Sequence, residues 1–151
     1  MTEISPASDA PLALPSRWLV TVCTYNEAEN LPRLIPAILE EAPDVDLLVV
    51  DDASPDGTGR IADEFARSDP RVRALHRAGK LGLGTAILAG IEYGRDQGYD
   101  FVLNMDADFS HHPRHLPALR GVMSSADVGI GSRYVSGGGT VGWSLTRRLM
   151  S

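Results

Sequence analysis

Short β-rich runs alternate with stretches of helical spacing along most of this 151-residue chain. Strands are predicted at residues 18–23, 46–51, 72–75, 101–105 and 127–132. Helices are predicted at residues 31–39, 61–66, 85–97 and 113–123, and another is predicted to begin within residues 143–150. This alternation favours the α/β class, in which a mostly parallel central sheet carries helices on both faces.

One domain is expected at this length, and residues 17–151 are predicted to form it. Residues 1–16 are rich in Pro, Ala and Ser and are predicted to be a mobile N-terminal tail. No stretch approaches 18 consecutive apolar residues, so no transmembrane helix is predicted. The formal net charge of −6 argues against a broad nucleic-acid-binding surface, so no nucleic-acid partner is expected. Cys23 is the only cysteine and is interpreted as a buried structural thiol.

Two carboxylates one residue apart, Asp106 and Asp108, follow the apolar run 101–105. In extended backbone, side chains two residues apart point to the same side, so this pair is expected to aim at one point. Like charges that close need a cation between them, and oxygen ligands suit Mg²⁺ or Mn²⁺, which also bind substrate phosphates. The pair therefore indicates a metal-diphosphate site, with Ser110 as a further candidate ligand. The alternative is a solvated acidic turn.

Three other polar turns, at residues 25–27, 51–52 and 133–134, also follow predicted strands. In parallel sheets ligands bind at the carboxyl ends of the strands, so these turns are expected to meet at one edge. A carboxylate of Asp51 or Asp52 is predicted to accept a hydrogen bond from a nucleotide, or else to cap the following turn.

The glycine-rich segment 79–84 lacks the Gly-Lys-Ser/Thr ending of a P-loop. The first turn has no glycine, so NAD binding and ATP hydrolysis are disfavoured. Lys80 in this segment either contacts a phosphate or is solvated. His111, His112 and His115 do not form a complete zinc set, and capping or surface roles are preferred for them.

Basic residues near the end of the chain, Arg133, Arg147 and Arg148, can bind phosphates through their guanidinium groups. Trp143 and Leu145 accompany the last two, and such an apolar and basic segment also suits contact with a membrane surface. Alternatively, the apolar side chains are core and the arginines are solvated.

Five motifs, at residues 24–27, 50–59, 80–86, 105–111 and 131–134, occur in family order, with Gly137–139 and Trp143 after them. Together they resemble the dolichyl-phosphate mannosyltransferase group of glycosyltransferase family two. The resemblance implies a GT-A-like fold, incomplete at the C-terminus because family catalytic domains continue further. It also implies metal-dependent, inverting transfer of mannose from GDP-mannose to a polyprenyl or dolichyl phosphate. Cys23 stands where the family usually has proline.

The same resemblance implies residue roles. The implied nucleotide-sugar contacts are Tyr25, Glu27, Val50, Asp52, Lys80, Asp106, Ala107 and Asp108. The implied ligands of Mg²⁺ or Mn²⁺ are Asp106, Asp108 and Ser110, and the implied acceptor-phosphate contacts are Arg133, Arg147 and Ser151. Asp108 and Arg133 are the implied catalytic residues.

The implied partners are GDP-mannose and a polyprenyl phosphate lipid, and the expected location is cytoplasmic and peripheral at the membrane surface. A membrane-anchoring partner or a homo-oligomer remains a further candidate. Two alternative functions stay open: a UDP-sugar donor for the same acceptor class, and a non-catalytic module that binds nucleotide or another partner.

Overall fold

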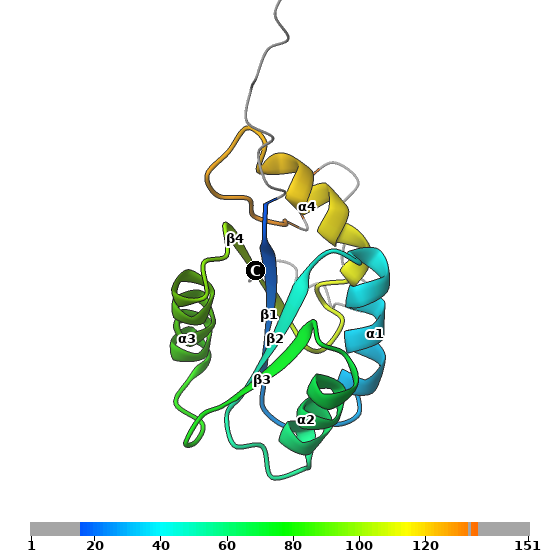
Figure 1. The fold of residues 1–151 in the computed structure, drawn as a ribbon, viewed down its shortest axis with the longest axis vertical. Helices are drawn as coiled ribbons and strands as arrows, with labels where there is room; N and C mark the ends of the chain where they lie inside the picture. The colour runs from blue at the N-terminus through cyan, green and yellow to red at the C-terminus, as the bar shows by residue number, and fades with distance from the viewer. Residues whose placement is uncertain (1–15, 133, 136–151) are drawn as a thin grey trace, which may run out of the picture. The chain divides into compact units, whose positions relative to one another are not determined.

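The computed structural model describes residues 16–132, 134 and 135 of the chain. The chain divides into two compact units, Met1–Pro113 and Arg114–Ser151. The first unit contains, in order, β1 (Trp18–Thr24), α1 (Leu31–Glu41), β2 (Asp46–Asp51), α2 (Thr58–Ser68), β3 (Val72–His76), α3 (Leu83–Asp96) and β4 (Phe101–Asp106) (Figure 1).

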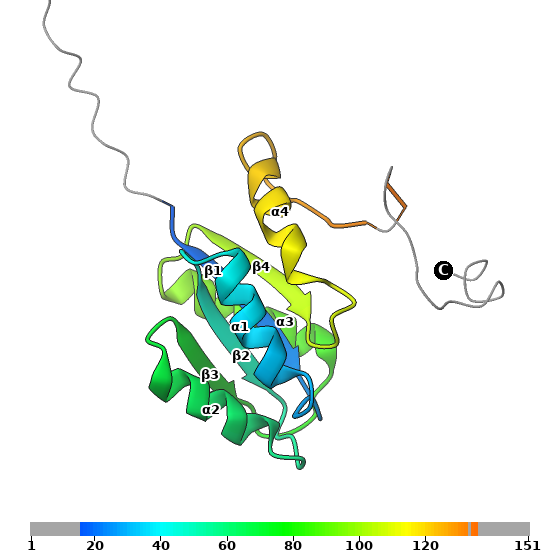
Figure 2. The same cartoon turned by 90° about the vertical axis from the view of Figure 1, so that its right-hand side faces the viewer.

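The four strands form one sheet in the order β3-β2-β1-β4, and every neighbouring pair is parallel. Helix α3 covers one face of this sheet, and α1 and α2 cover the other (Figures 1 and 2). The predicted α/β class, with a parallel sheet between helices, is confirmed. Because both faces of β1 and β2 are covered, these strands read as nearly continuous apolar runs in the sequence.

The core lies between the sheet and its helices. Strands β1 and β2 supply most of it, and α1 adds a stripe at helical spacing. Its fully buried members include Leu19, Val22, Leu31, Leu34, Ile35, Ile38, Leu47, Leu48, Val49 and Val50.

Helix starts differ from the sequence prediction in two places. Helix α2 begins at Thr58 and α3 begins at Leu83, so each reaches back into a segment predicted to be a turn or loop. Gly82 immediately precedes α3 with a φ of 99°, a conformation that a residue with a Cβ rarely adopts. Asn30 is the N-cap residue of α1 as predicted, but its side chain makes no capping hydrogen bond. Helix α1 continues through Pro36 to Glu41.

The predicted helix over residues 113–123 divides into a 3₁₀ turn, η1 (Pro113–His115), and a short helix, α4 (Leu116–Val122). The strand predicted at residues 127–132 is wrong, because this segment is irregular and no described strand pairs with it. Val128 and Ile130 are 73% and 83% exposed, and the intervening Gly129 contributes no side chain to pack. The helix predicted within residues 143–150 lies outside the described residues.

Within the part of the chain that the structure describes, no helix combines the length and apolarity needed to cross a membrane.

Candidate nucleotide-sugar site

Strand register brings the polar turns of the first unit to one edge of the sheet. Thr24 pairs with Asp51, Asp51 pairs with His76, and Cys23 pairs with Asp106. The carboxyl ends of all four strands therefore lie side by side, which confirms the predicted meeting of the turns after β1, β2 and β4. The turn at residues 133–134 belongs to the second unit, and Arg133 lies outside the described residues.

The turn after β1 is held by the turn after β2. The backbone N–H of Asn26 donates to the hydroxyl of Ser54 at 3.0 Å, and the N–H of Glu27 donates to the hydroxyl of Thr58 at 2.8 Å. Asn26 has a φ of 63°, in the left-handed region that asparagine tolerates better than most residues. These contacts fix the backbone beside Tyr25, whose side chain stays exposed.

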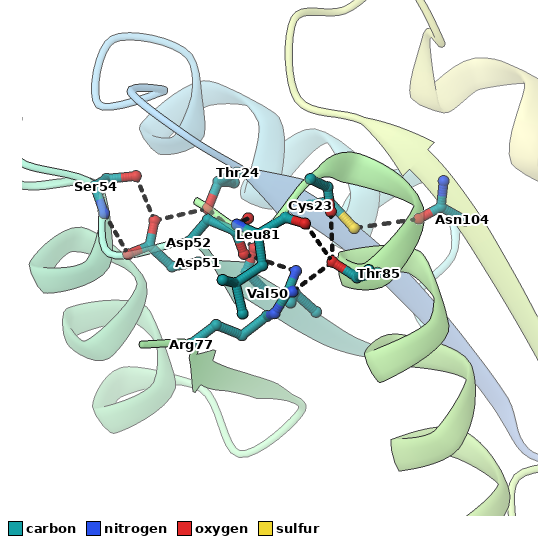
Figure 3. Close-up of polar contacts among 11 residues, drawn as sticks. Cys23, Thr24, Val50, Asp51, Asp52, Ser54, Arg77, Leu81, Thr85 and Asn104 are labelled. Carbon is teal, nitrogen blue, oxygen red and sulfur yellow. Dashed lines mark hydrogen bonds and ion pairs between the residues drawn. The ribbon is translucent and has the colours of Figure 1, made fainter. Parts of the chain in front are cut away.

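The carboxylate of Asp51 is buried and is hydrogen-bonded to neighbouring residues of the protein. Asp51 is 2% exposed, and its Oδ1 accepts hydrogen bonds from the hydroxyls of Thr24 at 3.0 Å and Ser54 at 2.5 Å. Its Oδ2 accepts a third, from the backbone N–H of Ser54 at 3.1 Å (Figure 3). Of the two neighbouring carboxylates at the end of β2, Asp51 is the last residue of the strand and is the one that caps the following turn.

Asp52 is also buried, at 5% exposure, but its partners come from the segment between β3 and α3. Its Oδ2 accepts from the backbone N–H of Leu81 at 3.2 Å, and its Oδ1 lies 2.9 Å from Nη1 of Arg77. The other terminal nitrogen of Arg77 donates to the hydroxyl of Thr85 at 2.6 Å, so the guanidinium bridges Asp52 and Thr85 (Figure 3).

Arg77 was missed by the sequence analysis. The available signal was a basic residue directly after the third predicted strand, at the edge where ligands bind in such sheets.

Lys80 lies over the ring of Tyr25, with Nζ 4.0 Å from the ring centre. The glycine-rich segment therefore reaches the turn after β1, and two residues predicted to contact the nucleotide sugar lie together. A third, Glu27, is partly buried and accepts a hydrogen bond at Oε2 from the side chain of Asn30 at 2.8 Å.

The extended backbone predicted from Asp106 to Asp108 is wrong. Strand β4 ends at Asp106, and Asp108 lies in the bends that follow. Asp106 is partly exposed, and its backbone N–H donates to Nδ1 of His111 at 3.2 Å. Asp108 is exposed, and hydrogen bonds from the hydroxyl and the backbone N–H of Ser110 hold the pKa of Asp108 below its usual value. Asp108 is therefore ionised at neutral pH.

These oxygen donors fit Mg²⁺ or Mn²⁺, which bind few protein carboxylates and complete their shells with water and substrate phosphates. In residues 16–132, 134 and 135, no group of three or more His, Cys, Asp or Glu side chains is arranged to hold a metal ion. A divalent ion at Asp106 and Asp108 would accordingly take further ligands from other groups, such as a bound diphosphate.

Two other predicted contact residues are buried. Val50 is 0% exposed and packs with Leu19, Leu48 and Ala86, so any contact that it makes to a ligand falls to its backbone. Ala107 is 3% exposed. The predicted acceptor-phosphate residues Arg133, Arg147 and Ser151 lie outside the described residues.

Cys23 lies at the same edge as a neutral thiol. Burial, with the negative charge of Asp52 as the next contribution, raises the pKa of Cys23 to about 11. Its Sγ donates to Oδ1 of Asn104 at 3.6 Å. A thiol that stays protonated at neutral pH is a poor nucleophile, which agrees with the structural role predicted for it, but Cys23 is partly buried and not fully buried as predicted.

A parallel sheet between helices, with carboxylates at the carboxyl edge, defines an α/β domain of the kind that binds ligands at the strand ends. The model of Glycosyl transferase family 2 matches residues 19–150, and the chain belongs to that family. The family named in the sequence analysis is thereby confirmed.

Relatives of known name are similar over most of this chain. An undecaprenyl-phosphate mannosyltransferase of Micrococcus luteus is 49% identical over 135 residues, which cover 89% of this chain and 56% of that protein. A polyprenol monophosphomannose synthase of Mycolicibacterium smegmatis is 50% identical over 137 residues, 89% of this chain and 52% of that protein. The chain thus spans about half the length of the curated relatives it matches.

Solved structures share the fold. The mannosyltransferase PcManGT from Pyrobaculum calidifontis, in complex with GDP-Man and Mn²⁺, matches with a TM-score of 0.53 and 27% identity. That match covers 69% of this chain and 31% of that one. TarS of S. aureus in complex with UDP matches with a TM-score of 0.53 and 22% identity, over 61% of this chain and 27% of that one. At that identity the second likeness shows the fold alone.

Proposed function

We propose that this chain supplies the nucleotide-sugar site of a metal-dependent, inverting transferase that moves mannose from GDP-mannose to a polyprenyl phosphate. The observation that carries the proposal is the placement of Asp52 and Asp106 at one edge of a parallel sheet. Asp52 directly follows β2 and Asp106 ends β4, and both strands pair with β1. The names of relatives that are 49% and 50% identical support the transferred sugar and the lipid acceptor. The GDP-Man and Mn²⁺ in the PcManGT complex support the donor and the metal.

In this proposal Tyr25, Glu27 and Asp52 bind the nucleoside, and Asp106 and Asp108 lie at the diphosphate. Mg²⁺ or Mn²⁺, held by Asp106, Asp108 and Ser110, would act as a Lewis acid for the departing diphosphate. Lys80 contacts the ring of Tyr25, so the glycine-rich segment lies beside the proposed nucleoside site. Arg133, Arg147 and Ser151 are proposed to bind the acceptor phosphate.

The reaction forms one bond and breaks one. An oxygen of the acceptor phosphate attacks the anomeric carbon of mannose, and the bond from that carbon to the diphosphate oxygen breaks. Attack from the opposite side inverts the configuration, and GDP leaves. The acceptor phosphate is ionised near neutral pH, so no strong general base is required. Arg133 is proposed to orient that phosphate, and this orientation contributes to the rate of transfer. A lipid acceptor means that the protein would work at a membrane surface.

The experiment is transfer of labelled mannose from GDP-mannose to a polyprenyl phosphate in detergent micelles, with Mg²⁺ or Mn²⁺. Lipid-linked product is expected, and chelation of the metal should abolish it. Asp108→Asn should lower transfer by about a hundredfold or more, because metal stabilisation of the leaving group is worth several kcal/mol. Asp96→Asn, on the exposed end of α3, is the matched control and should leave transfer unchanged.

The alternatives give different results in the same preparation. GDP binding without product from any polyprenyl phosphate would favour a non-catalytic nucleotide-binding module. Stronger binding of UDP than of GDP in the presence of Mn²⁺ would favour a different sugar donor. Full transfer by Asp108→Asn would refute the metal site.

A further inference from the structure

We infer that Arg77 is a positioning residue of the nucleotide site, which fixes the carboxylate of Asp52 for recognition of the nucleoside. The inference rests on the proposed function, because that function gives Asp52 its ligand. It adds a residue from outside the motifs on which the proposed function depends.

The contact between Arg77 and Asp52 is protected from water. Their side chains are 10% and 7% exposed, and Nη1 lies 2.9 Å from Oδ1. Both atoms are buried, and within the described part of the chain neither makes a hydrogen bond, so their contact is an ion pair alone. The ion pair is therefore what compensates each charge for its burial, and removal of one partner leaves the other uncompensated.

Arg77 is itself held from two sides. Its backbone N–H donates to the carbonyl of Asp51 at 2.8 Å, which anchors it beside the end of β2. Its second guanidinium nitrogen donates to Thr85 in the first turn of α3, at 2.6 Å. The planar fork of arginine can reach Asp52 and Thr85 at once, whereas the single ammonium of a lysine is a point charge on a flexible stem.

The arrangement leaves Asp52 able to bind a ligand. One oxygen faces Arg77 and the other accepts from the backbone N–H of Leu81 at 3.2 Å. An ionised carboxylate has about four lone-pair sites, so these two contacts occupy about half of its capacity. Because Oδ1 is buried, the site proposed to accept an N–H or O–H group of a nucleoside is the remaining lone pair of Oδ2, on a carboxylate whose orientation is already set. Preorganisation of this kind improves affinity because less freedom is lost on binding.

The test compares GDP with a ligand that lacks the nucleoside. Dissociation constants for GDP with Mn²⁺ and for inorganic diphosphate with Mn²⁺ are measured by calorimetry on the full chain. The variants are Arg77→Gln, Arg77→Lys and Thr85→Val. The matched control is Arg60→Gln, which removes an arginine from an exposed ion pair on α2.

Arg77→Gln is expected to weaken GDP binding by about tenfold or more, because it removes a charge-assisted contact from a buried carboxylate. Diphosphate binding should stay within about twofold, because that ligand lacks the group that Asp52 would recognise. Arg77→Lys should fall between Arg77→Gln and the unchanged chain, and Thr85→Val should weaken GDP binding by a smaller factor. Arg60→Gln should leave both ligands unaffected.

Equal loss of GDP and diphosphate binding would indicate a structural role only and would overturn the inference. Unchanged GDP affinity in all three variants would overturn it as well. If Arg77→Gln does not fold, Arg77→Lys and Thr85→Val decide by the same comparison of ligands. Absence of GDP binding by the unchanged chain would instead overturn the proposed function, and with it the role of Asp52.

Discussion

The ammonium of Lys80 lies 4.0 Å from the centre of the Tyr25 ring, so the glycine-rich segment and the turn after β1 meet through a cation–π contact. At exposed sites such a contact is worth about 0.5–1 kcal/mol, which is enough to favour one loop position without making it permanent. Tyr25 remains 36% exposed, so part of the residue that Lys80 contacts is open to solvent. The sequence left Lys80 open between phosphate contact and solvation, and neither option included an aromatic partner.

Replacement of Tyr25 separates ring stacking from the hydroxyl group. Tyr25→Ala is expected to weaken GDP binding by about tenfold, since stacking of a base on an aromatic side chain contributes about 1–3 kcal/mol. Tyr25→Phe keeps the ring and should bind GDP nearly as the unchanged chain does. Calorimetry with GDP and Mn²⁺ measures both. An equal loss in Tyr25→Ala and Tyr25→Phe would assign the contact to the hydroxyl instead of the ring.

Asp51 is predicted to matter for stability, because its carboxylate accepts three hydrogen bonds from Thr24 and Ser54. Asp51→Asn replaces one acceptor oxygen by an amide donor that faces other donors. The free energy of unfolding should fall by about 1–3 kcal/mol, the usual penalty for a buried polar group left unpaired. Urea denaturation measures it. Asp96→Asn, whose ion pair with Arg95 is exposed, is the control and should change stability by less than about 0.5 kcal/mol.

The parallel sheet and its ligand-binding edge could be predicted from the sequence, because burial on both faces leaves a continuous apolar run in each central strand. The direction in which the Asp108 side chain points could not be predicted. The sequence pattern does not locate the last residue of a strand, and β4 ends before Asp108. The position of Arg77 at the ligand-binding edge could have been predicted, but its pairing with Asp52 could not. Arg77 reaches it only because β2 and β3 are neighbours in the sheet, and periodicity along the chain does not give strand order.

The strand predicted at residues 127–132 failed for a related reason. A short apolar run is compatible with a buried strand, but pairing and burial decide the outcome, and the pattern reports neither. Val128 and Ile130 are exposed in the second unit, where no described strand pairs with the segment.

Two glycines of α3 should respond oppositely to alanine. A Cβ on Gly94 would meet Cγ2 of Val102 on β4 at 2.4 Å, whereas a Cβ on Gly84 would have nothing within 4 Å. Gly94→Ala is therefore expected to destabilise the protein by about 1–3 kcal/mol, the usual cost of overpacking. Gly84→Ala should stabilise it by about 0.5–1 kcal/mol, because alanine loses less backbone freedom in a helix. Thermal and urea unfolding of both variants measure the two effects. Shifts of the same sign would contradict the packing of α3 on β4.

Tyr99 provides the pH dependence that the structure predicts most directly. Its hydroxyl donates to Oδ2 of Asp46 at 2.5 Å, and burial together with this hydrogen bond raises the pKa of Tyr99 to about 12 from an ordinary value of 10.0. Because the folded value lies above the unfolded one, the stabilisation is fully present below about pH 10 and is lost as the pH rises through about 12. Tyr99→Phe lacks the hydroxyl and should be less stable by about 1 kcal/mol at neutral pH. The difference in unfolding free energy between the two proteins should therefore shrink across that window. Urea denaturation at a series of pH values measures it, and a difference that stays constant up to about pH 12 would show that the Tyr99 hydroxyl titrates alike in the folded and unfolded chains.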